Sequence, residues 1–430
     1  MRRALLPVLA ASALLPLIVG VPGLAAAQTA AHRAHAPAPA DSVLAWNATA
    51  ATTVLAAGKF PTEGLIHMSY VQGAVYDAVD AIAGGYQPYV GHLRAPHWAS
   101  VDAAVAAAAH DVLVTHLPTQ RASVDAAYAT ALAAIPDGKA KTAGIDVGVQ
   151  AAEQLLAART GDGLDAPVAY TFGSGPGAWI LPTDNTATNA QTPQTPWAAT
   201  MRPFLIRSAS QFRPGPPPDL TSARYAADLN ETQAWGSKTS TLRTADQTQI
   251  ARFWTASGIV PDNEAMRRVT QRLNLGATAT ARALAMLDMV EADSLIACFD
   301  AKYHYAAWRP YTAIRGADTD ANPATTADPT WLPLAATPNH PEYPAAHTCV
   351  TAAQGDVLAS VLGTTTINAD ISSPVTATTR RYDTVAQLDT EVLNARIWAG
   401  LHFRTSLQVG LTLGNRVARA ALDDHFQPLH

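Results

Sequence analysis

Three short basic clusters in the last third of the chain hold the side chains best suited to chemistry. Their members are one lysine, two arginines, two histidines and a proline-led turn: Lys302, Arg309-Pro310, Pro344-Ala345-Ala346-His347, Arg396 and His402. Buried cations, histidines and the free amides of a helix N-terminus are the groups with which proteins bind oxyanions. The three clusters together therefore predict a site that binds a tetrahedral oxyanion.

The first cluster lies at the end of an expected long helix. Residues 279–305 are rich in helix formers and contain neither Gly nor Pro, which places Lys302 near a helix C-terminus. We expect Arg309 to lie about two turns further on roughly the same face, and Pro310 to end the helix there. Both cations would then project from one helix end.

The other two clusters depend on a helix start and on a chain turn. Pro344 is suited to the first position of a helix that runs to Leu362, with the amides of Ala345 and Ala346 directed out of its N-terminus and His347 in the same turn. Arg396 and His402 can converge only if the chain turns between them. Gly400 supplies that turn, and another helix is expected from about Ser406.

These motifs resemble the signature of the vanadium-dependent haloperoxidase and type 2 phosphatidic acid phosphatase superfamily. The pattern is Lys302-x6-Arg309-Pro310, then Pro344-x2-His347, then Arg396-x5-His402, and the run His340-Pro341-Glu342-Tyr343-Pro344 looks closer to the haloperoxidase branch. The resemblance covers roughly residues 284–422. It implies an all-α fold of two stacked helical bundles, with the oxyanion site in the C-terminal bundle.

The same resemblance implies roles for individual residues, with vanadate as the cofactor and no haem. His402 would be the metal ligand. The vanadate oxygens would be bound by Lys302, Arg309, Arg396 and the amides of Ala345 and Ala346. His347 would be the general acid/base and Lys302 would polarise hydrogen peroxide, so that halide is oxidised to a hypohalous species that reacts with a small organic acceptor. His340 stands where bromide-preferring members tend to have His, which hints at bromide.

Two departures from the family pattern keep alternatives open. Ala345 and Ala346 replace the usual Ser and Gly, and the lost hydroxyl removes a bond worth about 1.5–3 kcal/mol. Ser406 stands where the phosphatase branch tends to place an Asp that orients the final histidine, which we take to weaken a phosphatase function. The alternatives are a secreted acid phosphatase with a phosphohistidine at His402, and a non-catalytic relic that only binds anions.

The N-terminal residues predict export. Met1-Arg2-Arg3, an apolar run and Ala25-Ala26-Ala27 are typical of a signal peptide over residues 1–27, of the Sec type or of the twin-arginine type. Residues 28–40 would be a flexible leader. No later stretch of about twenty apolar residues occurs, so we expect a secreted or periplasmic protein whose mature form has no membrane segment.

Composition and proline distribution suggest the domain organisation. A net charge of -5 with 15% charged residues gives no basic surface for nucleic acid. The composition is compatible with a monomer and with an oligomer. We expect an N-terminal helical bundle at 41–165, a Pro-rich connector at 166–222 and a C-terminal bundle at 223–430. Helices are expected near 42–57, 64–82, 100–117, 123–133, 141–159, 244–256, 263–273, 278–307, 345–362, 386–398 and 406–424.

The chain has two cysteines, Cys298 and Cys349, each close in sequence to a site residue. In an exported protein such a pair could form a disulfide. Neither lies in a context typical of a catalytic nucleophile.

Overall fold

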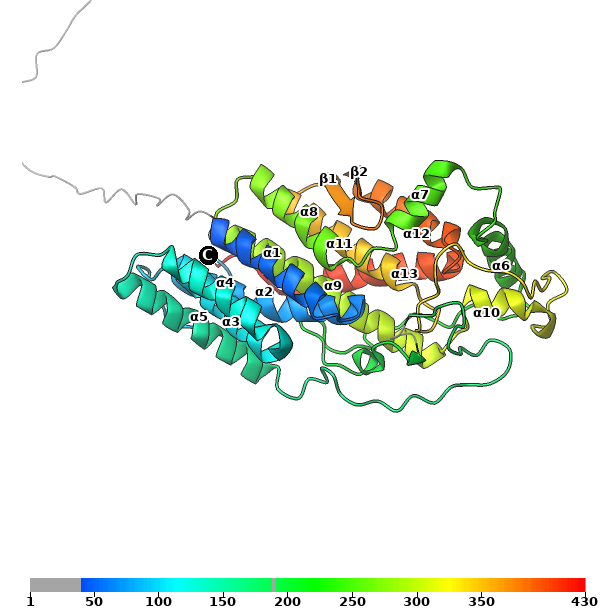
Figure 1. Ribbon diagram of the computed structural model, residues 1–430, viewed down its shortest axis with the longest axis horizontal. Helices are drawn as coiled ribbons and strands as arrows, with labels where there is room; N and C mark the ends of the chain where they lie inside the picture. The colour runs from blue at the N-terminus through cyan, green and yellow to red at the C-terminus, as the bar shows by residue number, and fades with distance from the viewer. Residues whose placement is uncertain (1–39, 188–190, 430) are drawn as a thin grey trace, which may run out of the picture. The chain divides into compact units, whose positions relative to one another are not determined.

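The computed structural model describes residues 40–187 and 191–429. The predicted signal peptide and residues 28–39 of the leader lie outside this range. Helices dominate the described chain, which confirms the all-α prediction (Figure 1).

The first half contains α1 (Asp41–Ala56), α2 (Pro61–Ala83), α3 (Val101–His116), the short 3₁₀ helix η1 (Pro118–Gln120), α4 (Arg121–Ala133), α5 (Lys139–Ala158) and η3 (Pro196–Ala199).

The second half supplies the elements around the predicted site. They are α6 (Ala223–Gly236), α7 (Ala245–Phe253), α8 (Ile259–Arg272), α9 (Ala277–Tyr305), α10 (Pro310–Arg315), η4 (Ala317–Thr319), α11 (Ala346–Leu362), β1 (Thr366–Ser373), β2 (Thr378–Thr384), α12 (Val385–Trp398) and α13 (Arg404–Asp424). Among the described helices, none is long and apolar enough to cross a membrane.

Helix α9 is the central element of the core. It is 29 residues long, and its side chains are buried on nearly every face from Ala281 to Lys302. Helices α2, α8, α11 and α13 all pack against it. A helix whose side chains are buried on nearly every face must be surrounded by other elements. This burial fixes the position of Lys302, at the C-terminal end of α9.

Two glycines let α13 approach α11 closely. A Cβ atom at Gly414 would lie 2.1 Å from the carbonyl oxygen of Cys349, and one at Gly410 would lie 2.7 Å from that of Ala345. No larger residue fits at such separations without moving one of the helices. The two glycines therefore help to place the first turn of α11 beside α13.

An antiparallel hairpin of β1 and β2 lies between α11 and α12 and was not expected from the sequence. Strand β1 buries alternate residues, Ile367, Ala369, Ile371 and Ser373, as a half-buried strand does. It packs on α8 and α11. Helix α6 was missed as well, because the residues it buries, which include Tyr225, Thr232 and Gly236, form no strong apolar stripe.

The proline-rich segment follows an irregular path beside the site motifs. Its backbone exchanges hydrogen bonds with the chain beyond α9: Trp308 N–H donates to Gly177 O at 2.9 Å, and Trp179 N–H donates to Ala306 O at 2.7 Å. Further along, Gln194 N–H donates to Asn339 O at 2.8 Å. The domain boundaries at 165 and 222 stay a prediction.

Candidate active site

The structure brings the predicted site residues together from five places in the chain. Lys302 lies in the last turn of α9, and Arg309 directly precedes α10. His347 lies in the first turn of α11. Arg396 is near the end of α12, and His402 lies between α12 and α13.

Lys302 is fully buried and held by backbone carbonyl groups. Its Nζ donates to Pro341 O at 2.8 Å and to Glu342 O at 2.9 Å, both in the segment before α11. Burial lowers the pKa of Lys302 to about 8, and the neighbouring Arg309 adds to the lowering. The cation is therefore fixed in place, and its charge is sensitive to pH near neutrality.

Arg309 reaches the site from outside α9, contrary to the sequence-based expectation. The helix ends at Tyr305 because Ala306 adopts a left-handed conformation with φ of 46°, and Arg309 is the extended residue before α10. Its Nε donates to His340 O at 2.7 Å, and its Nη2 lies 2.9 Å from His340 Nδ1. Its Nη1 donates to Leu401 O at 3.0 Å and lies 3.1 Å from His402 Nε2. Burial lowers the pKa of Arg309 to about 10.

The N-terminus of α11 offers one of the two amides that were predicted to bind an anion. The helix begins at Ala346, and the N–H of Ala345 donates instead to Ser406 O at 3.2 Å. The Ala345 side chain packs with Leu393 and Leu407, away from the site. Ala346 lines a cavity, and its N–H is among the first amides of the helix, which have no intrahelical acceptor.

His402 is oriented by a glutamate that sequence analysis did not assign. Glu342 Oε1 accepts a hydrogen bond from His402 Nδ1 at 2.9 Å and another from Phe403 N–H at 3.1 Å. The chain turn that allows this arrangement occurs at Gly400, with φ of 78°, as predicted. Burial raises the pKa of Glu342 to about 7, and Lys302 opposes the rise. With Nδ1–H committed to Glu342, the lone pair of His402 is on Nε2, the nitrogen that faces Arg309.

This contact corrects the argument drawn from Ser406. That argument took the missing Asp on α13 to leave the histidine without a carboxylate, but Glu342 supplies one from the segment before α11. Ser406 Oγ instead donates to the backbone carbonyl of Glu342 at 3.4 Å. The sequence does place a glutamate, Glu342, within the motif His340–Pro344. Because a buried carboxylate needs a partner, Glu342 was a candidate to pair with a histidine of the site.

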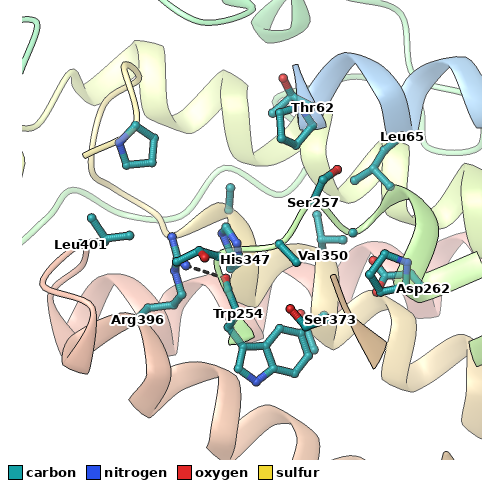
Figure 2. Close-up of a pocket in the computed structure, with 18 of the residues that line it drawn as sticks. Thr62, Leu65, Trp254, Ser257, Asp262, His347, Val350, Ser373, Arg396 and Leu401 are labelled. Atoms are coloured by element: carbon teal, nitrogen blue, oxygen red, sulfur yellow. Dashed lines mark hydrogen bonds between the residues drawn. The ribbon is translucent and has the colours of Figure 1, made fainter. Parts of the chain in front are cut away.

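Arg396 and His347 face a cavity of about 430 Å³, and His340 and Ala346 also line it (Figure 2). Arg396 Nη1 donates to the carbonyl oxygen of Trp254 at 2.7 Å, and its buried Nε has no hydrogen-bond partner among the described residues. Burial and the nearby Arg309 lower the pKa of Arg396 to about 9. Burial, followed by Arg396, also lowers the pKa of His347, so its imidazole is neutral near pH 7.

The buried charges indicate the kind of ligand. Arg396 makes no ion pair with any described carboxylate, although buried charges in proteins are normally paired. In the described chain, no group of three or more His, Cys, Asp or Glu residues is placed to hold a metal ion. A histidine nitrogen, three cations and a helix amide therefore fit an oxyanion that binds through one histidine, and do not resemble a cage for a metal cation.

The two cysteines lie close to the cations of the site, and Lys302 and Arg309 act electrostatically on Cys298. Cys298 and Cys349 are both buried and free, so the disulfide considered above is not formed in the structure. Their side chains are in hydrogen-bonding contact, and Cys298 Sγ donates to Pro344 O at 3.6 Å. They link the packing of α9 with the chain that enters α11.

Comparisons with known proteins agree with this fold. Residues 282–429, which contain every predicted site residue, match a family profile described as the VCPO second helical-bundle domain. The whole fold is similar to that of a bacterial vanadium-dependent iodoperoxidase, with 22% identity, a TM-score of 0.76, and coverage of 91% of this chain and 96% of that one. No curated protein matches the sequence.

Two further solved structures show the same fold. The holo form of a bacterial vanadium-dependent chloroperoxidase is 18% identical with a TM-score of 0.69, and the match covers 84% of this chain and 91% of that one. The apo form is 17% identical with a TM-score of 0.68, covering 84% and 92%. The chain thus has the helical-bundle fold of vanadium haloperoxidases. Fold and profile together are consistent with the haloperoxidase and type 2 phosphatidic acid phosphatase superfamily, which confirms the resemblance predicted from the motifs.

Proposed function

We propose that this protein is a vanadate-dependent haloperoxidase, which uses hydrogen peroxide to oxidise a halide to a hypohalous species. The observation that carries the proposal is a set of three buried cations, Arg309, Lys302 and Arg396, that act electrostatically on His402. Arg309 lies 3.1 Å from His402 Nε2, and Arg396 has no ion-pair partner among the described residues. The named activities of the structural relatives support it. Bound vanadate would supply a Lewis-acid centre that activates peroxide without a change of metal oxidation state.

Of the residues that would hold vanadate, one would form a bond to it and the others would bind its oxygens. His402 would bind through Nε2, while the hydrogen bond from Nδ1–H to Glu342 fixes its ring orientation and tautomer. Lys302, Arg309 and Arg396 would neutralise the oxygens, and the Ala346 amide would donate at the N-terminus of α11. The backbone carbonyls of Pro341 and Trp254 hold two of these cations in place.

His347 is placed to move protons at the cavity wall. Burial lowers its pKa, and a neutral imidazole can accept the proton that hydrogen peroxide gives up when it binds. The protonated ring would then be stabilised by the negative charge of the bound oxyanion. Lys302 would polarise the peroxide, since two backbone carbonyl groups hold its ammonium group in place.

We propose that bromide is slightly favoured among the halides, because His340 stands where bromide-preferring members of the family tend to have His. Arg309 Nη2 donates to its ring at 2.9 Å, and the ring lies against Phe299 with the centroids 5.2 Å apart. The relatives named above act on iodide and on chloride by their descriptions. We also propose that the protein is exported, from the signal-peptide pattern at residues 1–27.

A phosphatase is the second candidate, and one contact favours it. A nucleophilic histidine needs a carboxylate that fixes its tautomer, and Glu342 provides one to His402. His402 Nε2 would attack phosphorus, and His347 would protonate the leaving alcohol.

One assay separates these functions. The purified protein is tested for bromide oxidation with hydrogen peroxide and for hydrolysis of p-nitrophenyl phosphate, with and without orthovanadate. We expect bromide oxidation that depends on vanadate, and phosphoester hydrolysis that is weak and inhibited by vanadate. Phosphoester turnover without any vanadate-dependent halide oxidation would support the phosphatase. Tight vanadate binding without turnover of either substrate would support the anion-binding relic.

A further inference from the structure

The cavity that holds His347 has a second polar end, formed by an acidic residue that the proposed reaction does not use. Asp262 lies in the first turn of α8, is 6% exposed and lines the cavity with Thr62 and Ser257. In Figure 2, Asp262 lies on the side of the cavity away from Arg396, with His347 and Val350 between them. The cavity therefore has a cationic end and an acidic end.

More carboxyl groups lie behind Asp262, with few donors to satisfy them. Asp288 and Glu291 of α9 are fully buried, and both oxygens of Glu291 lack a hydrogen-bond partner among the described residues. Asn263 Nδ2 donates to Asp288 Oδ1 at 2.8 Å, and the amide of Gln354 lies beside Asp262. Burial raises the pKa of Asp262 to about 7 and that of Asp288 to about 8. Burial also raises the pKa of Glu291, and Asp262 adds to this rise.

The wall between the two ends is largely apolar. Phe253, Trp254, Leu295, Val350 and Ile371 line it. A volume of about 430 Å³ is in the range in which proteins enclose most of a small organic ligand. The indole of Trp254 is fixed by a hydrogen bond from Nε1 to Glu391 at 3.1 Å. The cavity is thus a preformed site with a largely apolar wall, a cationic end, and an acidic end whose Asp262 carboxylate is ionised above about pH 7.

We propose that this cavity binds the organic acceptor of the reaction and that Asp262 selects acceptors with a primary ammonium group, of the arylalkylamine class. The proposal rests on the proposed haloperoxidase function for its use. An ammonium group would pair with the Asp262 carboxylate, whereas the cations at the other end would repel it. The aromatic ring of the acceptor would then face His347, near the place where the halogenating species forms.

A test of this subsite uses binding alone, with no vanadate, halide or peroxide present. Isothermal titration calorimetry compares tyramine with tyrosol, which has a neutral hydroxyl in place of the amine, and with 4-hydroxyphenylacetate, which has a carboxylate there. We expect tyramine to bind at least about tenfold more tightly than tyrosol, as for a charge-assisted hydrogen bond. The carboxylate analogue should pair with the cations at the other end, so inorganic phosphate should displace it but should not displace tyramine.

Variants assign the selectivity to a residue. Asp262→Asn should bring tyramine and tyrosol to within about twofold of each other. Glu264→Gln is the matched control, because it removes a carboxylate from the same helix at a site paired with Arg268 on the surface; it should preserve the preference. If Asp262→Asn fails to fold, the comparison of ligands on the native protein still decides the matter.

Two results would overturn the proposal. One is equal affinity of the native protein for tyramine and tyrosol, and the other is an undiminished preference for tyramine in a folded Asp262→Asn variant. Halide oxidation measured without an organic amine tests the proposed function separately. A protein that oxidises bromide but does not discriminate between the ligands would reject the subsite alone, and one that discriminates without oxidising halide would reject the haloperoxidase alone.

Discussion

Glu342 Oε1 lies 2.9 Å from His402 Nδ1, and this contact joins the segment before α11 to the turn before α13. It fixes His402, whose other ring nitrogen, Nε2, lies 3.1 Å from Nη1 of the buried Arg309. The same oxygen accepts the backbone N–H of Phe403, so the carboxylate holds both the ring and the chain that carries it.

Replacing Glu342 by Gln should therefore weaken vanadate binding by about 10- to 100-fold, because partners behind a ligating histidine contribute on that scale. The pKa of Glu342 is raised to about 7, so its carboxylate is present above that pH and is lost as the pH falls through it. Native affinity for vanadate should decline below about pH 7. The variant should lack this acidic decline, and a titration of vanadate affinity against pH measures both effects.

Glu231→Gln is the control for this variant, since Glu231 pairs with Arg404 at 2.6 Å near the start of α13 but outside the site. It should leave vanadate affinity unchanged. A Glu342→Gln protein with native affinity and a native pH profile would show that the contact does not position His402.

The charge of Lys302 should control anion affinity on the alkaline side. Burial lowers its pKa to about 8, so the positive charge is present below this value and is lost as the pH rises through it. Sulfate is a suitable probe because its charge is constant over the range. We expect its affinity to fall between pH 8 and 9, by up to about tenfold for the loss of one proton.

Lys302→Arg provides the comparison, because a guanidinium keeps its charge to higher pH. The fall in sulfate affinity should move to higher pH in that variant. An unchanged alkaline profile would mean that another group titrates.

His347 and His402 should have separable effects. His402→Ala removes the proposed bond to vanadium and should abolish vanadate binding. His347→Ala should leave vanadate affinity within about threefold, but slow bromide oxidation by about 10²–10⁴-fold, as for a lost general acid/base. Equal loss of vanadate affinity in the two variants, measured by equilibrium dialysis, would contradict this division.

The two alanines that replace the family's Ser and Gly should respond differently to a hydroxyl. Ala346 lines the cavity, and Ala346→Ser should add a donor and tighten vanadate binding by roughly tenfold, equal to about 1.4 kcal/mol. Ala345 packs among apolar side chains, so Ala345→Ser should leave the affinity unchanged. A gain in Ala345→Ser alone would show that its side chain reaches the anion.

The long helices and the identity of the cationic residues could be predicted from the sequence. Helix α9 has an uninterrupted run of helix-forming residues, and the three motifs occur in a fixed order. Helix α6 and the β1–β2 hairpin were missed because their stability depends on the surfaces they pack against. Strand β1, for example, buries Ile367 and Ile371 on α8 and α11.

The errors within the site have a similar cause. The separation of Glu342 from His402 in the sequence gives no sign of their contact. Whether the amide of Ala345 is available depends on Ser406 O, which reaches it only because Gly410 and Gly414 let α13 approach α11. Residue types predicted which groups could form the site, and the tertiary contacts determine where each of these groups lies.

The central claim is that this site binds one vanadate and uses it to oxidise halide. The most direct measurement titrates the purified protein with orthovanadate and follows bound vanadium, by equilibrium dialysis, together with the rate of bromide oxidation. We predict that both saturate together at one vanadium per chain, and that inorganic phosphate displaces the metal and lowers the rate in parallel. Bound vanadium that saturates without any bromide oxidation, or a rate that is unchanged when phosphate displaces it, would contradict the account.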